Sequence, residues 1–161
     1  MYGAGTTNEW VVREFIEDPD NNPCIYHGMP LRTEYRVFID CDTDEILGIT
    51  PYWRPDIMKK RFGNESDRNT PDMIHDYIIY TAHEPVLMKR YEENKDRIIS
   101  EVKNLLPAID LPGQWSLDIM QNGNDFYLID MAMAYSSALN DIVPKSKLLH
   151  DPMPVQQFLT T

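Results

Sequence analysis

The chain has 161 residues, 42% of them hydrophobic, and contains 9 tyrosines, 5 phenylalanines and 3 tryptophans. This composition predicts a single folded domain over residues 1–161 and argues against a disordered chain. The formal net charge of −11 argues against nucleic acid as a partner, because phosphate binding draws on clustered Lys and Arg.

The sequence shows no sign of export or of membrane insertion. Its first residues have neither the basic region nor the apolar run of a signal peptide, and no later run is long enough to span a bilayer. The two cysteines, Cys24 and Cys41, make no CxxC pair and suggest no disulfide framework. We therefore expect a protein of the reducing cytoplasm with no membrane partner.

Residues 10–17, WVVREFIE, are the first predicted strand. Alternation places Glu14 on one face with Trp10, Val12 and Ile16, where a bare carboxylate would be costly to bury. Glu14 therefore needs a donor. Two donors remain open: an arginine of a neighbouring strand, and an amino group of a ligand.

The next strand is predicted over residues 31–40, LRTEYRVFID, and its hairpin partner over residues 45–50. Arg32, Glu34 and Arg36 recur at every second position and therefore share one side of the strand. A side charged in this way suits either a solvated sheet face or a phosphate-binding cleft, and both interpretations stay open.

Between residues 54 and 106 helical periodicity replaces alternation. Thr-Pro-Asp at 70–72 is a typical helix start. Pro85 predicts a second helix or a kink, because the residue before a proline is biased away from helical dihedrals. The expected apolar stripe of the part before Pro85 consists of Met73, Ile74, Tyr77 and Ile78. That of the part after Pro85, which Pro107 ends, consists of Leu87, Tyr91, Ile98, Val102 and Leu105.

A closing hairpin is predicted over residues 114–132, where two alternating runs flank the turn signal Asn-Gly-Asn-Asp at 122–125. With an odd-numbered loop centred on Asn124, Asp118 lies across from Asp130, and Ile119 lies across from Ile129. The expected buried face then consists of Trp115, Leu117, Ile119, Tyr127, Ile129 and Met131.

The other face of this hairpin would carry two opposed carboxylates, Asp118 and Asp130. Like charges directly across from each other are destabilising unless something neutralises them. A divalent cation is a natural neutraliser, and Mg²⁺ commonly takes one or two carboxylates together with substrate phosphates. Two solvated aspartates near a turn are the alternative, and the sequence leaves both open.

The order of these parts resembles the carboxy-terminal lobe of ATP-grasp proteins, most closely the small bacterial and phage clades with an arginine-rich strand. The resemblance rests on the hinge-like REFIE, on PLRTEYRVFID, on the long helical segment, and on WSLDIM with FYLIDMA. It covers roughly residues 10–138. It implies an α+β fold in which antiparallel β-hairpins pack against helices.

The resemblance also implies that the ligand is ATP. In the family, adenine is held at the hinge strand, which corresponds here to Glu14, Phe15 and Ile16. Glu17 would be a ribose contact. The nucleotide would be accompanied by Mg²⁺.

The remaining site residues follow from the two later motifs. Arg32 and Arg36 would approach the phosphates, and Arg36 is the expected catalytic residue, offsetting charge on the transferring phosphoryl group. Glu34 takes the place of a family acid in the same strand. Asp118 and Asp130 would hold Mg²⁺.

Two departures from the family pattern stand out. Many members place a second metal ligand, often Asn, two residues after the last acid, where this chain has Ala132. Ser136, Ser137 or Asn140 could compensate. The family also grasps nucleotide between two lobes, and we expect this chain to lack the first lobe, with its lysines and phosphate-covering loop. It would then be part of a longer enzyme or a reduced relative, completed by another chain or a second copy of itself.

The family's reaction joins a carboxylic acid to an amine or thiol through an acyl phosphate made with ATP. The expected function is therefore that of the ATP- and Mg-binding lobe of such a ligase, acting on an unknown small-molecule or peptide substrate and inactive by itself. The alternative is a non-catalytic nucleotide-binding or assembly module that keeps the fold.

Overall fold

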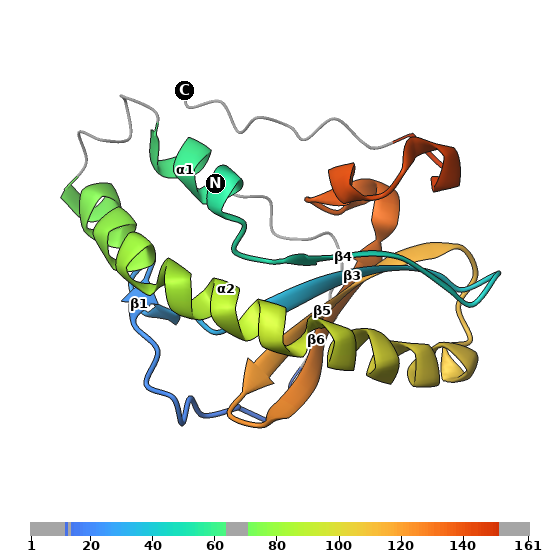
Figure 1. Ribbon diagram of the computed structural model, residues 1–161, viewed down its shortest axis with the longest axis horizontal. Coiled ribbons are helices and arrows are strands. Elements are labelled where there is room, and N and C mark those ends of the chain that lie inside the picture. The colour runs from blue at the N-terminus through green and yellow to red at the C-terminus, as the bar shows by residue number, and fades with distance from the viewer. Residues whose placement is uncertain (1–11, 13, 64–70, 152–161) are drawn as a thin grey trace.

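The computed structural model describes residue 12 and residues 14–63 and 71–151 (Figure 1). In these residues one long helix packs against a four-stranded antiparallel sheet, and a small two-stranded hairpin lies beside the helix. The predicted α+β class is confirmed at this level. In the same part of the chain, no helix has the apolar length needed to cross a bilayer.

The sheet is built from two hairpins placed side by side. β3 (Glu34–Asp40) pairs with β4 (Glu45–Pro51), and β5 (Gln114–Asn122) pairs with β6 (Asp125–Met133). β3 and β5 are also antiparallel neighbours, so the strand order is β4-β3-β5-β6. Both predicted hairpins are confirmed, although the strand expected from residue 31 begins only at Glu34. The small separate hairpin consists of β1 (Cys24–Ile25) and β2 (Met29–Pro30).

The closing hairpin has the predicted pairing of acids but a different turn. Asp118 lies directly across from Asp130. The turn is tighter than predicted, because Asn122 already pairs with Asp125 and Gly123 adopts the left-handed φ of 61° that such a turn requires.

A bulge reconciles this tight turn with the acid pairing. The register shifts after Asp118, so Ile119 faces Leu128 and not the predicted Ile129. A one-residue shift exchanges the two faces of a strand. As a result Phe126 packs against the core beneath helix α2, and Tyr127, predicted to be buried, is exposed.

Helix α2 (Pro71–Leu105) runs without a break through Pro85, so of the two predicted alternatives the second helix is wrong, and the kink stays a prediction. A shorter helix, α1 (Pro55–Gly63), precedes it. The apolar stripe is confirmed in the second half of α2, where Leu87, Tyr91, Ile98 and Val102 are buried. Three predicted stripe residues, Ile74, Ile78 and Leu105, are instead exposed.

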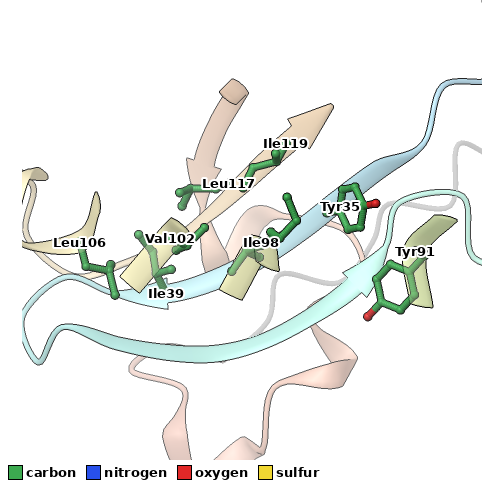
Figure 2. Packing of buried hydrophobic residues seen from close by; sticks show 9 residues of the cluster. Tyr35, Ile39, Tyr91, Ile98, Val102, Leu106, Leu117 and Ile119 are labelled. Carbon is green, nitrogen blue, oxygen red and sulfur yellow. The ribbon is translucent and has the colours of Figure 1, made fainter. Parts of the chain in front are cut away.

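The two halves of α2 pack on different partners. Tyr80 and Leu87 belong to a cluster with Ile25, Leu31, Trp53, Met58 and Phe62, outside the sheet. The second half covers one face of the sheet. Figure 2 shows this main core, in which Tyr91, Ile98, Val102 and Leu106 meet Tyr35, Val37, Ile39, Leu117 and Ile119.

The opposite face of the sheet is covered at one end by the segment after β6, drawn in orange and red in Figure 1. This segment forms short 3₁₀ turns at Ala134–Ser136, Asn140–Ile142 and Lys145–Lys147. Its Ala134 and Val143 pack on Phe38 and Leu47. The strand residues beyond this small cluster are free to build a polar site.

The strand predicted over residues 10–17 is wrong for the residues that the structure describes. Residues 12 and 14–17 form no strand, and residues 10, 11 and 13 lie outside the described residues. Val12 is 93% exposed and Phe15 is 83% exposed. Glu14 is exposed as well, so the expectation that it lies between buried apolar neighbours is also wrong. Within the described residues this segment has no strand partner that could bury one of its faces.

Candidate functional site

Three charged side chains form a row across β3, β5 and β6, on the sheet face opposite α2. Arg36 of β3 lies directly across from Asp118 of β5, and Asp118 lies directly across from Asp130 of β6. Glu34 shares this face of β3, because Tyr35 and its alternate neighbours point to the core. Strand pairing therefore gathers four of the predicted site residues from distant parts of the chain.

Arg36 and Asp118 form a two-point ion pair in the middle of the row. The arginine Nε donates to Oδ1 of Asp118 at 2.7 Å, and Nη2 donates to Oδ2 at 2.6 Å. The third nitrogen, Nη1, donates to the Ala138 carbonyl at 3.1 Å. The guanidinium also lies 4.8 Å from the centre of the Tyr52 ring. Burial disfavours the charge of Arg36, but the hydrogen bonds and charge of Asp118 outweigh it and raise the arginine pKa.

Glu34 has a raised pKa. Burial is the largest cause and the nearby charge of Asp118 adds to it, while Arg36 and Arg32 act in the opposite direction, and the net pKa is about 7. A carboxyl group that exchanges its proton near neutral pH is suited to general acid–base chemistry. This displaced pKa follows from the neighbours that tertiary structure supplies, since the alternating pattern alone shows only the charges along β3.

Arg32 lies just before β3 and is buried with one donor unused. Its Nη2 donates to the Ile16 carbonyl at 2.6 Å and its Nη1 to Met120 Sδ at 3.1 Å. Its Nε is buried and has no hydrogen-bond partner, and the same holds for Thr33 Oγ1. Buried polar groups are nearly always hydrogen-bonded, so Arg32 Nε and Thr33 Oγ1 are exceptions to this rule.

The predicted hinge residues are only partly drawn into the site. The backbone of Ile16 reaches it through Arg32, whose guanidinium holds the Ile16 carbonyl. Glu14, Phe15 and Glu17 are exposed. The hydrogen bond from Arg32 to the Ile16 carbonyl thus joins residues 14–17 to the charged face of the sheet.

The acid pair can supply oxygen ligands but does not form a complete metal cage. Asp130 is exposed and Asp118 is buried. In the described ranges, no three His, Cys, Asp or Glu side chains meet in a way that could hold a metal ion. Mg²⁺ commonly completes its shell with water and substrate phosphates, so two carboxylates would suffice when nucleotide is present.

Two of the three predicted substitutes for the missing metal ligand, Ser136 and Ser137, are engaged elsewhere, and the contribution of Asn140 stays a prediction. Ser136 Oγ and Ser137 Oγ both donate to the Met133 carbonyl at 3.0 Å. Ser137 Oγ also lies 2.6 Å from Ser116 Oγ. These hydroxyl groups hold the start of the C-terminal segment against β5 and β6.

Sequence reasoning missed two partners of Arg36, the Tyr52 ring and the Ala138 carbonyl. Tyr52 follows the last residue of β4, and its backbone N–H donates to the Glu34 carbonyl at 2.9 Å, which continues the β3–β4 ladder. The sequence signal that could have identified Tyr52 is its position, because it is an aromatic residue that directly follows β4, the strand paired with the Arg36 strand. A backbone carbonyl carries no such signal in the sequence.

Comparisons with known proteins add no relative. No known protein-family model matches the chain, and searches of curated proteins and of solved structures found no match.

Proposed function

We propose that the chain is the nucleotide- and metal-binding lobe of an ATP-grasp ligase. The observation that carries the proposal is the gathering of Arg32, Glu34, Arg36, Asp118 and Asp130 around one sheet face by β3, β5 and β6. These residues come from the two motifs on which the resemblance rests. Basic and acidic groups arranged together in this way suit a phosphate chain that carries a divalent cation.

The residues present fit such a ligand. The unused Nε of Arg32 is an orphaned buried donor that a phosphate oxygen could satisfy. Asp118 and Asp130 face each other across two strands and would hold Mg²⁺ together. Bound ATP would supply the phosphoryl group that activates a carboxylic acid as an acyl phosphate for attack by an amine or thiol.

Each side chain has a task at this site. Arg32 and Arg36 would bind phosphate oxygens, and Arg36 would offset charge during transfer. Glu34, with its pKa raised to about 7, would hold or release a proton beside the phosphates. The backbone of Ile16, held by Arg32, would lie at the adenine end, and the exposed Phe15 beside it would offer a ring to the base.

Without ligand, Arg36 and Asp118 neutralise each other. To bind a ligand, Arg36 and Asp118 must break at least one of the two hydrogen bonds between them. This loss is compensated only if a cation binds Asp118 and an anion binds Arg36. A buried charge left without its partner is strongly unfavourable. Mg²⁺ and nucleotide should therefore bind together more tightly than either binds alone.

Calorimetric titration with ATP tests the proposal. We expect ATP to bind in the presence of Mg²⁺ or Mn²⁺ and to lose at least ~10-fold in affinity with EDTA, which corresponds to about 1.4 kcal/mol. Asp130→Asn should weaken Mg-ATP binding by a similar factor, because it removes one of two carboxylate ligands. Asp130 is exposed, so this change should leave folding intact.

Asp125→Asn is the matched control. Asp125 is an exposed acid of the same strand and lies at the turn, away from Arg36. It should bind Mg-ATP as the wild type does. Equal affinity in the wild type, Asp130→Asn and Asp125→Asn, or binding indifferent to EDTA, would remove the metal and nucleotide assignment.

A non-catalytic nucleotide-binding or assembly module remains the second candidate. It is favoured by the hydrogen bonds of Arg36, which engage the whole guanidinium group within the protein. Its Nε, Nη1 and Nη2 all donate to protein oxygens. ADP release, measured with Mg²⁺ and ATP in the presence and absence of a pool of carboxylate and amine substrates, tests for catalysis. Because the lobe by itself is expected to be inactive, ATP binding without turnover is the expected result for both candidates. Turnover at roughly 1 per second or faster that requires the substrates would exclude the non-catalytic module and would show that the site needs no further lobe.

A further inference from the structure

A pocket lies at the Gln114 end of β5, apart from the site described above. Its volume is about 130 Å³, and its lining includes Trp115, Met133, Tyr135 and His150. It shares no lining residue with the charged row of Arg36, Asp118 and Asp130. Its volume is well below the roughly 300–1,000 Å³ of sites for drug-sized ligands, so it suits one small chemical group.

Three aromatic side chains from three segments line this pocket. Tyr135 and His150 stand edge to face, with ring centres 5.4 Å apart and planes at 72°, so they form two adjoining walls. The indole N–H of Trp115 donates to the Pro112 carbonyl at 2.9 Å, which orients the third ring. Leu149 N–H donates to Gln114 Oε1 at 3.0 Å and ties the segment carrying His150 to the sheet. The walls are therefore held in place without a ligand.

The charges around the pocket are negative. Asp42 Oδ1 accepts from the backbone N–H of Gly113 at 3.0 Å, and Asp40 Oδ2 accepts from the side chain of Gln114 at 2.8 Å. Gly113 and Gln114 both line the pocket, so two carboxylates lie directly behind its wall. Lys147, whose carbonyl accepts from the Gln114 side chain at 2.7 Å, has its ammonium group 3.4 Å from Glu45 Oε2. Among the described residues, the lining contains no Lys or Arg.

We propose that this pocket binds a methylated ammonium group, as carried by choline and related small organic cations. Aromatic faces attract such cations through the ring quadrupole, and the methyl groups fill apolar walls. The carboxylates of Asp40 and Asp42 add attraction, whereas they would repel an anion. An uncharged group of the same shape would gain only the apolar contacts and should bind more weakly than the methylated ammonium group.

Calorimetric titration of the full chain at pH 8 tests this proposal with choline and with tetramethylammonium. We expect dissociation constants on the order of 1 mM. The decisive comparison is 3,3-dimethyl-1-butanol, which has the shape of choline without its charge and should bind at least ~10-fold more weakly. Equal binding of choline and the neutral alcohol, or no binding of either cation, would overturn the proposal.

Substitutions at Tyr135 test the role of the ring. Tyr135→Leu should weaken choline binding about 5-fold or more, and Tyr135→Phe should preserve it. Loss of choline binding by Tyr135→Phe, or full binding by Tyr135→Leu, would contradict the aromatic role. The comparison of choline with its neutral analogue uses the wild-type chain and therefore stands even if Tyr135→Leu fails to fold. Mg-ATP should not compete with choline, because the two sites share no residue.

Discussion

At the scale of single residues, two arginine–aspartate pairs have similar geometry in different surroundings. Arg36 meets Asp118 at 2.7 and 2.6 Å, and Arg54 meets Asp56 at 2.9 and 2.6 Å. The Asp118 side chain is 9% exposed, however, and the Asp56 side chain is 52% exposed. Burial determines how much stability is lost when one partner of each pair is removed, since water can replace that partner only at the exposed Arg54–Asp56 pair.

We therefore expect Asp118→Ala to lower the free energy of unfolding by about 3–5 kcal/mol, because it leaves the Arg36 charge buried and unpaired. Asp56→Ala is the matched change at the exposed pair and should cost about 1 kcal/mol or less. Urea denaturation without nucleotide or metal measures both. Equal losses for the two variants would show that the buried pair has no special role in stability.

Glu34 should make stability depend on pH. Its pKa is raised from 4.5 to about 7 in the folded chain. Between these values the folded chain keeps the proton and the unfolded chain does not, so Glu34 lowers stability as pH rises through this window, with no further loss above it. The free energy of unfolding of Glu34→Gln minus that of the wild type should thus increase between pH 5 and pH 8, by at most about 3 kcal/mol.

The exposed acid Glu45 of the neighbouring strand β4 provides the control for Glu34. The difference in the free energy of unfolding between Glu45→Gln and the wild type should show no comparable increase between pH 5 and pH 8. Paired urea denaturation curves at several pH values give both differences. A constant difference between Glu34→Gln and the wild type across this range would show that the Glu34 pKa is not raised.

At the scale of elements, helix α2 contains a proline in its interior. Pro85 removes one backbone hydrogen bond and its ring crowds the preceding turn. Pro85 is exposed, and the helix continues through it. Pro85→Ala should therefore raise the free energy of unfolding by about 1–3 kcal/mol.

Val86→Ala is the control for this change, since it alters the neighbouring exposed residue of the same turn and leaves the proline. It should shift stability by roughly 0.5 kcal/mol or less. Thermal unfolding followed by circular dichroism compares the variants. A Pro85→Ala variant less stable than the wild type would show that the proline sets a helix geometry on which the packing depends.

At the scale of the whole molecule, the sheet has two different faces. α2 covers the apolar residues of β3 and β5 on one face. The segment after β6 covers only one end of the other, through a small cluster around Phe38. The strand residues that remain on this second face are therefore the ones that can hold charge, and Glu34, Arg36 and Asp118 lie there.

Much of this arrangement is present in the local pattern of the sequence. Alternation in residues 34–40 and 114–122 determines which side chains share a face, because side chains of a strand alternate with period two. The Asn-Gly turn signal locates the closing hairpin, and the bulge after Asp118 then brings Asp118 opposite Asp130. The helical period likewise identifies the buried residues of α2 from Leu87 to Val102.

Only the tertiary structure decided which strands are neighbours. Arg36 and Asp118 are 82 positions apart, and they meet because β3 pairs with β5. Local periodicity specifies a face but not a partner strand, so neither the ion pair nor the raised Glu34 pKa could be read from it. The same reason explains Ile74 and Ile78, whose helical spacing predicted burial although that side of α2 faces no element in the described chain.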